Sequence, residues 1–160
     1  MISFFDWIIS SNIFQTMKLR IDNEAMIEEF FTDTRLLGIV APIEQYRFCW
    51  HLNKMLSFDF RINNNIEIQL NKKARKYFFP IYEYGERSGT IKHYLYNNQD
   101  DGEYLLPEFK HLDFLWLIKD DIMLDEEVGM LTSSIRAMPA VQLITEMTNE
   151  KIRNKQHLIF

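Results

Sequence analysis

Residues that form disulfides and flexible linkers are scarce in this sequence. Five glycines and four prolines among 160 residues leave little room for linkers. The one cysteine, Cys49, excludes a disulfide within the chain and is typical of a reducing compartment. No apolar run is long enough to cross a membrane. Together these absences predict a cytoplasmic protein that is not a membrane protein.

Common catalytic and metal-binding motifs are also missing. The sequence has no Gly-x-Ser-x-Gly, no Gly-x-x-x-x-Gly-Lys, no His-x-x-x-His and no Cys-x-x-Cys. We therefore expect no enzyme activity, no cofactor and no metal. We expect Cys49 to lie on the buried face of a helix. We expect the four histidines to lie on the surface: His51, His93, His111 and His157.

What the chain does contain is material for a core. Hydrophobic residues make up 47% and aromatic residues 14%, which favours a folded globule over disorder. The formal net charge of −5 argues against broad binding to nucleic acid or anionic membranes. A chain of this length is enough for one domain.

The first sixteen residues stand apart from the rest. Met1–Thr16 is rich in apolar residues, but no Lys or Arg precedes them, so the segment does not match a secretory signal. Met17 is a natural start. We expect residues 1–16 to be an extension from a misassigned start or an added helix, and residues 17–160 to form the single domain.

Apolar periodicity predicts two long helices and a sheet. The helices are expected over 43–58 and 124–138, and a short helix is expected after Asn23. A turn is expected over 63–65. The predicted strands cover 18–22, 35–40, 66–70, 77–84, 91–96, 112–118 and 141–147.

This order of elements predicts an α+β two-layer sandwich. The short turns between the middle strands favour antiparallel pairing, and the helix between 112–118 and 141–147 would make a βαβ crossover if those strands are parallel neighbours. We expect a mixed, mostly antiparallel sheet with both long helices on one face. The architecture is ferredoxin-like or ACT-like by analogy.

The stretch from Tyr104 to Lys119 organises the chain. Pro107 and Glu108 are typical of a single helical turn, and a nearly continuous apolar run follows. Leu106-Pro107-Glu108 followed by Leu112-Asp113-Phe114 resembles the signature of the bacterial IPExxxVDY family, and further similar segments are Leu37–Ile39, Tyr46–Asn53 and Leu158–Phe160. The resemblance implies a small cytoplasmic protein of unknown function. Phe114 stands where the family has tyrosine, so no role can depend on that hydroxyl here.

The two carboxylates of this motif have two interpretations. Glu108 and Asp113 could divide general acid and base roles. Alternatively, Glu108 caps a turn and Asp113 ties a strand end to backbone amides or to an arginine. We favour the second interpretation, because no nucleophile or metal-ligand pattern accompanies them.

Two further segments are candidate binding sites. The first is Lys72–Phe79, where basic residues are followed by aromatic residues, a pattern that could bind single-stranded RNA. The candidate contacts are Lys72, Lys73, Arg75, Lys76 and Tyr77. Arg47, His51 and Lys54, on the face of the helix over 43–58 that is opposite its apolar stripe, could extend this candidate site. The alternative is a solvated loop before a core strand, which the acidic balance favours.

The second candidate segment is the apolar end of the chain, Leu158-Ile159-Phe160. We expect it to dock either in this protein's own core or in a groove of a partner or second subunit.

Our leading hypothesis is a non-enzymatic protein-interaction module, with a protein partner or self-association. The alternatives are an RNA-associated accessory protein acting through Lys72–Phe79 and an ACT-like small-molecule sensor with its ligand near the central stretch.

Overall fold

The computed structural model describes residues 22–87 and 89–160, which belong to two compact units, Met1–Thr32 and Asp33–Phe160. In the first unit residues 22–30 are helical, which confirms the short helix predicted after Asn23. The expected extension over residues 1–16 and nearly all of the expected strand over 18–22 lie outside the described residues. The division falls after Thr32, later than the boundary expected after Thr16.

The second unit is built on a six-stranded sheet with the order β2-β3-β4-β7-β1-β8. A separate two-stranded hairpin consists of β5 and β6. The strands are β1 (Arg35–Val40), β2 (Arg61–Lys72), β3 (Arg75–Gly85), β4 (Lys92–Asn97), β5 (Gln99–Asp100), β6 (Glu103–Tyr104), β7 (Phe114–Lys119) and β8 (Leu143–Met147).

Every neighbouring pair in the six-stranded sheet is antiparallel. β7 and β8 run in the same direction, but β1 lies between them and pairs with both. The expectation that these two strands would be parallel neighbours in a mixed sheet was therefore wrong. The early strand β1 inserts into the gap between them and makes the sheet antiparallel throughout.

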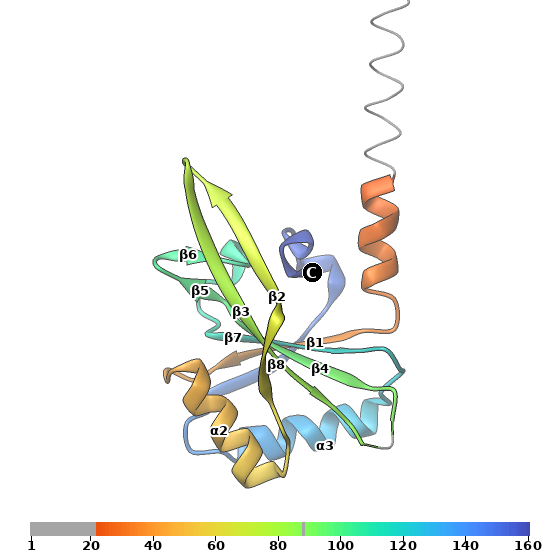
Figure 1. Cartoon of the computed structure of the whole chain (residues 1–160). Coiled ribbons are helices and arrows are strands. Elements are labelled where there is room, and N and C mark those ends of the chain that lie inside the picture. The colour runs from red at the N-terminus through yellow and green to blue at the C-terminus, as the bar shows by residue number, and fades with distance from the viewer. Residues whose placement is uncertain (1–21, 88) are drawn as a thin grey trace, which may run out of the picture. The chain divides into compact units, whose positions relative to one another are not determined.

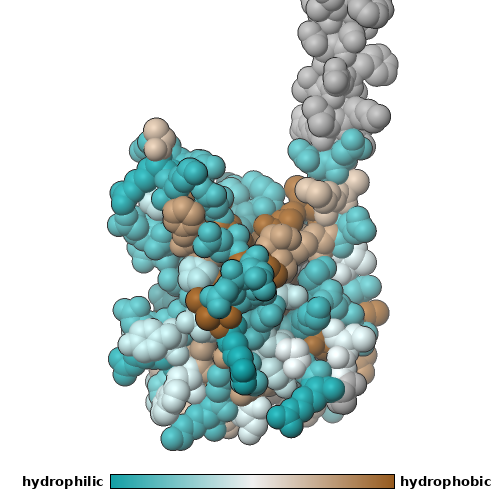
Figure 2. Space-filling view, in the orientation of Figure 1, coloured by the Kyte–Doolittle hydropathy of each residue, from teal (hydrophilic) through white to brown (hydrophobic). Residues whose placement is uncertain are grey.

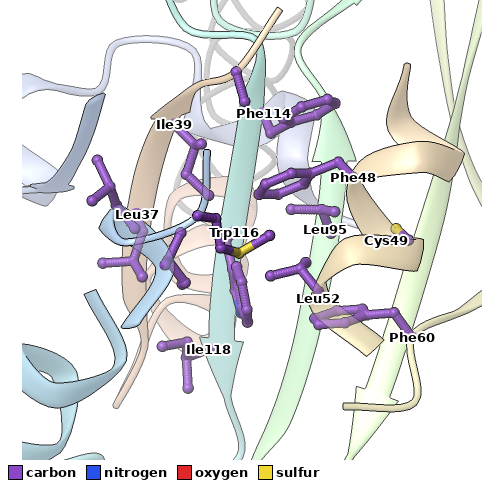
Figure 3. Packing of buried hydrophobic residues seen from close by; sticks show 14 of the residues in the cluster. Leu37, Ile39, Phe48, Cys49, Leu52, Phe60, Leu95, Phe114, Trp116 and Ile118 are labelled. Carbon is purple, nitrogen blue, oxygen red and sulfur yellow. The ribbon is translucent and has the colours of Figure 1, made fainter. Parts of the chain in front are cut away.

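Both long helices cover one face of this sheet, α2 (Gln45–Leu56) and α3 (Asp125–Arg136) (Figure 1). This confirms the predicted α+β sandwich. Phe48 and Leu52 of α2 are fully buried against the sheet, and the Phe48 ring stacks on Phe114 of β7 with 4.7 Å between centroids (Figure 3). Val128 and Ile135 of α3 close the other part of the same core.

The opposite face of the sheet is covered by the last residues of the chain (Figure 1). Leu95 packs in the helix-side core, so its strand neighbours Tyr94 and Tyr96 point to the other side. There the Tyr96 hydroxyl donates a hydrogen bond to the carbonyl of Leu158, at 3.1 Å. The short 3-10 turns that support this layer are η1 (Pro107–Phe109), η2 (Asn149–Lys151) and η3 (Lys155–Leu158), and η1 confirms the single turn predicted at Pro107.

β2 and β3 form a long hairpin that was only partly predicted. The expected turn at 63–65 lies inside β2, where the pairing register shifts between Ile62 and Glu67. The turn of the hairpin is instead Lys73-Ala74, and both residues have positive φ, 49° and 61°. Two such residues give the two-residue turn that matches the twist of paired strands. The basic segment is therefore the tip of a hairpin and not a loop before one strand.

Gly38 in β1 is a position where a side chain has no room. A Cβ atom there would lie 2.5 Å from Cδ1 of Leu112 and 3.0 Å from Sδ of Met147, both buried side chains. Gly129 in α3 is the opposite case, because a Cβ there would have no atom within 4 Å.

We expect Gly38→Ala to lower the free energy of unfolding by about 1–3 kcal/mol, because the buried Leu112 must shift to relieve the contact. Gly129→Ala is the matched control, and we expect it to raise stability by up to about 1 kcal/mol through helix propensity. Urea unfolding of both variants followed by circular dichroism measures the difference. Equal stability of Gly38→Ala and the unsubstituted chain would contradict the close packing of β1 on Leu112.

Candidate functional site

Glu108 of the motif holds the end of the chain in place. Its Oε1 accepts hydrogen bonds from the backbone N–H groups of Arg153 and Asn154, at 2.7 and 2.9 Å. Its Oε2 accepts one from the Asn154 side chain, at 2.8 Å. Burial alone would raise the pKa of Glu108, but the hydrogen bonds from Asn154 and Arg153 outweigh it and lower the pKa below its ordinary value. Glu108 is thus an ionised clamp engaged on backbone and amide donors.

Asp113 makes a different connection within the same motif. Its Oδ2 accepts a hydrogen bond from the backbone N–H of Ala41, at 2.8 Å. Its own backbone N–H donates to the carbonyl of Ile39, at 2.9 Å, so Asp113 ties the start of β7 to the end of β1. The two motif carboxylates therefore hold separate segments of backbone. Asp113 ties a strand end to a backbone amide, as the favoured interpretation of the sequence had it, whereas Glu108 was expected to cap a turn and instead holds Arg153 and Asn154.

Asn98 is a structural residue that sequence reasoning missed. Its side chain is fully buried, donates to the carbonyls of Phe109 and Leu112 at 2.9 and 3.0 Å, and accepts from the Leu106 N–H at 2.9 Å. All three partners lie in the loop between β6 and β7. The only sequence signal was an asparagine between the strands predicted over 91–96 and 112–118, and asparagine is too common in such connections to single it out.

Of the three apolar residues at the end of the chain, Leu158 docks in this protein's own core, and Phe160 is 38% exposed. Leu158 is fully buried, and the Phe160 ring lies 4.8 Å from Tyr94 and 6.5 Å from Tyr96 between centroids. Ile159 is half-buried. The sequence left open whether this end docks in the protein's own core or on a partner. Leu158 docks in the protein's own core, so it does not offer a free surface to a partner.

The basic hairpin is less basic than its sequence indicates. Lys72 Nζ lies 2.6 Å from Glu103 Oε2, and Arg75 forms an ion pair with Asp101 and lies over the Tyr77 ring. The acidic hairpin of β5 and β6 therefore neutralises two of the four cations that were candidate RNA contacts. Lys73 at the turn and Lys76 remain exposed.

His93 is buried, so the expectation that it would lie on the surface was wrong. It is 1% exposed in an aromatic box where the Tyr84 ring stacks on it and the rings of Phe58 and Phe60 lie within 6.4 Å of it. The indole N–H of Trp116 donates to its Nδ1 at 3.1 Å. This contact requires a neutral imidazole with its proton on Nε2.

The thiol of Cys49 is shielded by the core of the protein. Cys49 is buried as predicted, and burial raises the pKa of its thiol to about 12, which keeps it protonated at neutral pH. Within residues 22–87 and 89–160, no group of three or more His, Cys, Asp or Glu side chains could hold a metal ion. No helix in this part of the chain is long and apolar enough to cross a membrane.

A hollow of about 350 Å³ lies beside the central stretch, where the sequence placed the ligand of a sensor. Three of its polar lining groups are engaged by backbone: Asp113 accepts from Ala41, Gln45 donates to the carbonyl of Leu95, and Asn97 donates to the carbonyl of Gln99. Glu44 and Arg47, both exposed, line it as well. The three engaged groups are less available to select a ligand than free ones.

The outer face of α2 is the second feature that sequence reasoning did not identify in full. Tyr46 is 62% exposed and Trp50 is 55% exposed, one helical turn apart. The Lys54 ammonium lies 5.0 Å from the Trp50 ring centroid, and the His51 ring lies 5.1 Å from it. Arg47 is exposed beside them. We call these five residues, Tyr46, Arg47, Trp50, His51 and Lys54, the α2 surface.

The cationic side of the α2 surface was predicted, since Arg47, His51 and Lys54 were placed opposite the buried stripe. The aromatic side was not, although the same helical spacing put Tyr46 and Trp50 on that arc. Comparison of the chain with protein-family models and with curated proteins finds no match, so the site rests on the geometry above.

We expect Glu108→Ala to loosen the end of the chain, because three donors on Arg153 and Asn154 lose their acceptor. The free energy of unfolding should fall by about 1–3 kcal/mol, and amide hydrogen exchange should accelerate over residues 152–159. Glu126→Gln, an exposed carboxylate on α3, is the control and should leave that exchange unchanged. Unchanged exchange in Glu108→Ala would show that Glu108 is not a clamp.

The buried His93 predicts a loss of stability in acid. Burial lowers the pKa of His93 although Glu86, 3.5 Å from Nε2, opposes the shift. The unfolded chain therefore binds a proton that the folded chain resists, and the free energy of unfolding should fall as the pH drops below about 6.5. Urea unfolding at several pH values measures this. In His93→Gln the slope of stability against pH between 5 and 7 should be smaller, and an unchanged slope would contradict the assignment.

Proposed function

We propose that this chain is a non-enzymatic, cytoplasmic protein-binding module of the IPExxxVDY type, and that the α2 surface is its contact surface. The observation that carries the proposal is the exposure of Tyr46 and Trp50, both more than half exposed and one turn apart. Large aromatic side chains are the residues that most often dominate the binding energy of protein interfaces.

The support for this location comes from how α2 is built. One arc of the helix, with Phe48 and Leu52, is fully buried against the sheet, so folding alone accounts for those apolar residues. Tyr46 and Trp50 lie on the other arc, where folding does not require apolar side chains. Exposing aromatic area to water stabilises nothing in the isolated chain.

The surroundings of the aromatic pair favour a protein partner. Lys54 over the Trp50 ring and Arg47 beside Tyr46 supply cations at the edge of an apolar centre, which is the arrangement of interface cores and rims. RNA through the basic hairpin is less supported, because Glu103 and Asp101 already pair with Lys72 and Arg75.

The motif residues support the proposal indirectly. Glu108 and Asp113 both accept hydrogen bonds from backbone N–H groups. Their role as ties leaves the surface, and not the motif, as the place to look for activity.

Capture from a native lysate tests the proposal. The full chain should retain a protein that resists nuclease treatment, and Trp50→Ala should reduce its retention at least about tenfold, as for a central aromatic anchor. Phe78→Ala is the matched control, because Phe78 is an aromatic residue 46% exposed on the hairpin. Circular dichroism should show both variants folded.

Equal retention by the Trp50→Ala variant and the unsubstituted chain would reject the α2 surface. Loss with Phe78→Ala, or loss on nuclease treatment, would instead transfer the function to the basic hairpin and to RNA.

A further inference from the structure

A second exposed apolar site lies at the start of α3 and has the opposite charge. Residues 120–127 read Asp-Asp-Ile-Met-Leu-Asp-Glu-Glu and contain five carboxylates and no cation. Within this segment Ile122 is 64% exposed and Leu124 is 63% exposed. We call residues 120–127 the acidic corner.

We propose that the α2 surface binds the acidic corner of a second copy of this chain. The inference rests on the proposed function and names one partner for the same surface. Tyr46 and Trp50 would pack on Ile122 and Leu124 of the other copy, and Arg47 and Lys54 would face its carboxylates.

Charge complementarity is the first argument. α2 carries Arg47, His51 and Lys54 and has no Asp or Glu over Gln45–Leu56, although acidic residues outnumber basic residues 23 to 18 in the chain. Within the described residues no ion pair involves Arg47 or Lys54, so both are available to an acidic surface. Matched potentials of this kind steer association and fix its register.

The state of the carboxylates in the acidic corner is the second argument. Four of them are engaged within the chain and hold the corner in shape. Asp125 pairs with Arg35 at 2.8 Å, and Glu127 accepts the N–H of Leu124 at 2.8 Å. Asp120 lies 3.8 Å from both Lys92 and Lys119, and Asp121 accepts from the Thr90 hydroxyl at 2.6 Å. Glu126 lies between Asp125 and Glu127 on the exposed side of the first turn of α3. The acidic corner therefore presents carboxylates and two exposed apolar side chains, which are complementary to the cations and aromatic rings of the α2 surface.

The arrangement of the helices is the third argument. The start of α3 is the end that lies away from α2 in the helix layer (Figure 1). The two surfaces therefore cannot meet within one copy, and their pairing requires two molecules. Different patches meet in such a contact, so the chain can associate further as its concentration rises.

Sedimentation velocity of crossed variants tests this inference. One variant removes the α2 surface, Trp50→Ala with Lys54→Glu, and the other removes the acidic corner, Leu124→Ala with Glu126→Lys. The unsubstituted chain should associate below about 0.1 mM, and each variant alone should be monomeric. An equimolar mixture of the two should form a heterodimer, because one intact α2 surface then meets one intact acidic corner. Phe78→Ala is the control and should associate like the unsubstituted chain.

A monomeric unsubstituted chain up to about 0.1 mM would overturn the inference, as would variants that still associate alone or a mixture that stays monomeric. A monomeric chain that still captures a lysate protein through Trp50 would reject self-association and leave the proposed function standing. Failure of both experiments would reject both.

Discussion

The arrangement of the motif depends on one buried amide, the side chain of Asn98. Its three hydrogen bonds hold Leu106, Phe109 and Leu112 in the loop between β6 and β7. That loop carries Glu108 at the place where it accepts the N–H groups of Arg153 and Asn154. A buried polar group without a partner costs about 1–3 kcal/mol, so replacing Asn98 by an apolar residue would leave several backbone groups unsatisfied at once.

The motif therefore belongs to the scaffold. Glu108 holds the end of the chain on the face of the sheet opposite α2, and Asp113 joins β7 to β1. These ties complete the second layer and bury Leu158. The exposed aromatic and charged residues of α2 and of the start of α3 are not needed for these ties, which is why we propose the α2 surface as the contact surface.

Local pattern was enough for much of this fold. The strand predicted over 35–40 has those bounds in the structure. The helix stripe expected to be buried was Phe48, Cys49, Leu52, Met55 and Leu56; the first three are buried and Leu56 packs against the core, but Met55 is 52% exposed. Strand order was not predictable, because nothing local in β1 indicates that it inserts between β7 and β8. His93 was misplaced because β4 is buried on both faces, and a single histidine among aromatic residues does not indicate which of them surround it.

The candidate site was half predictable for a similar reason. The charged residues on the outer arc of α2 were identifiable from the sequence. Tyr46 and Trp50 could not be told apart from core aromatic residues until the structure showed that they are exposed.

The most direct test places a photocrosslinking amino acid at position 46 or, as the comparison, at position 78, and irradiates native lysate. The account predicts protein adducts from position 46 that persist after nuclease treatment, and few from position 78. Adducts only from position 78, or adducts only with nucleic acid, would contradict it.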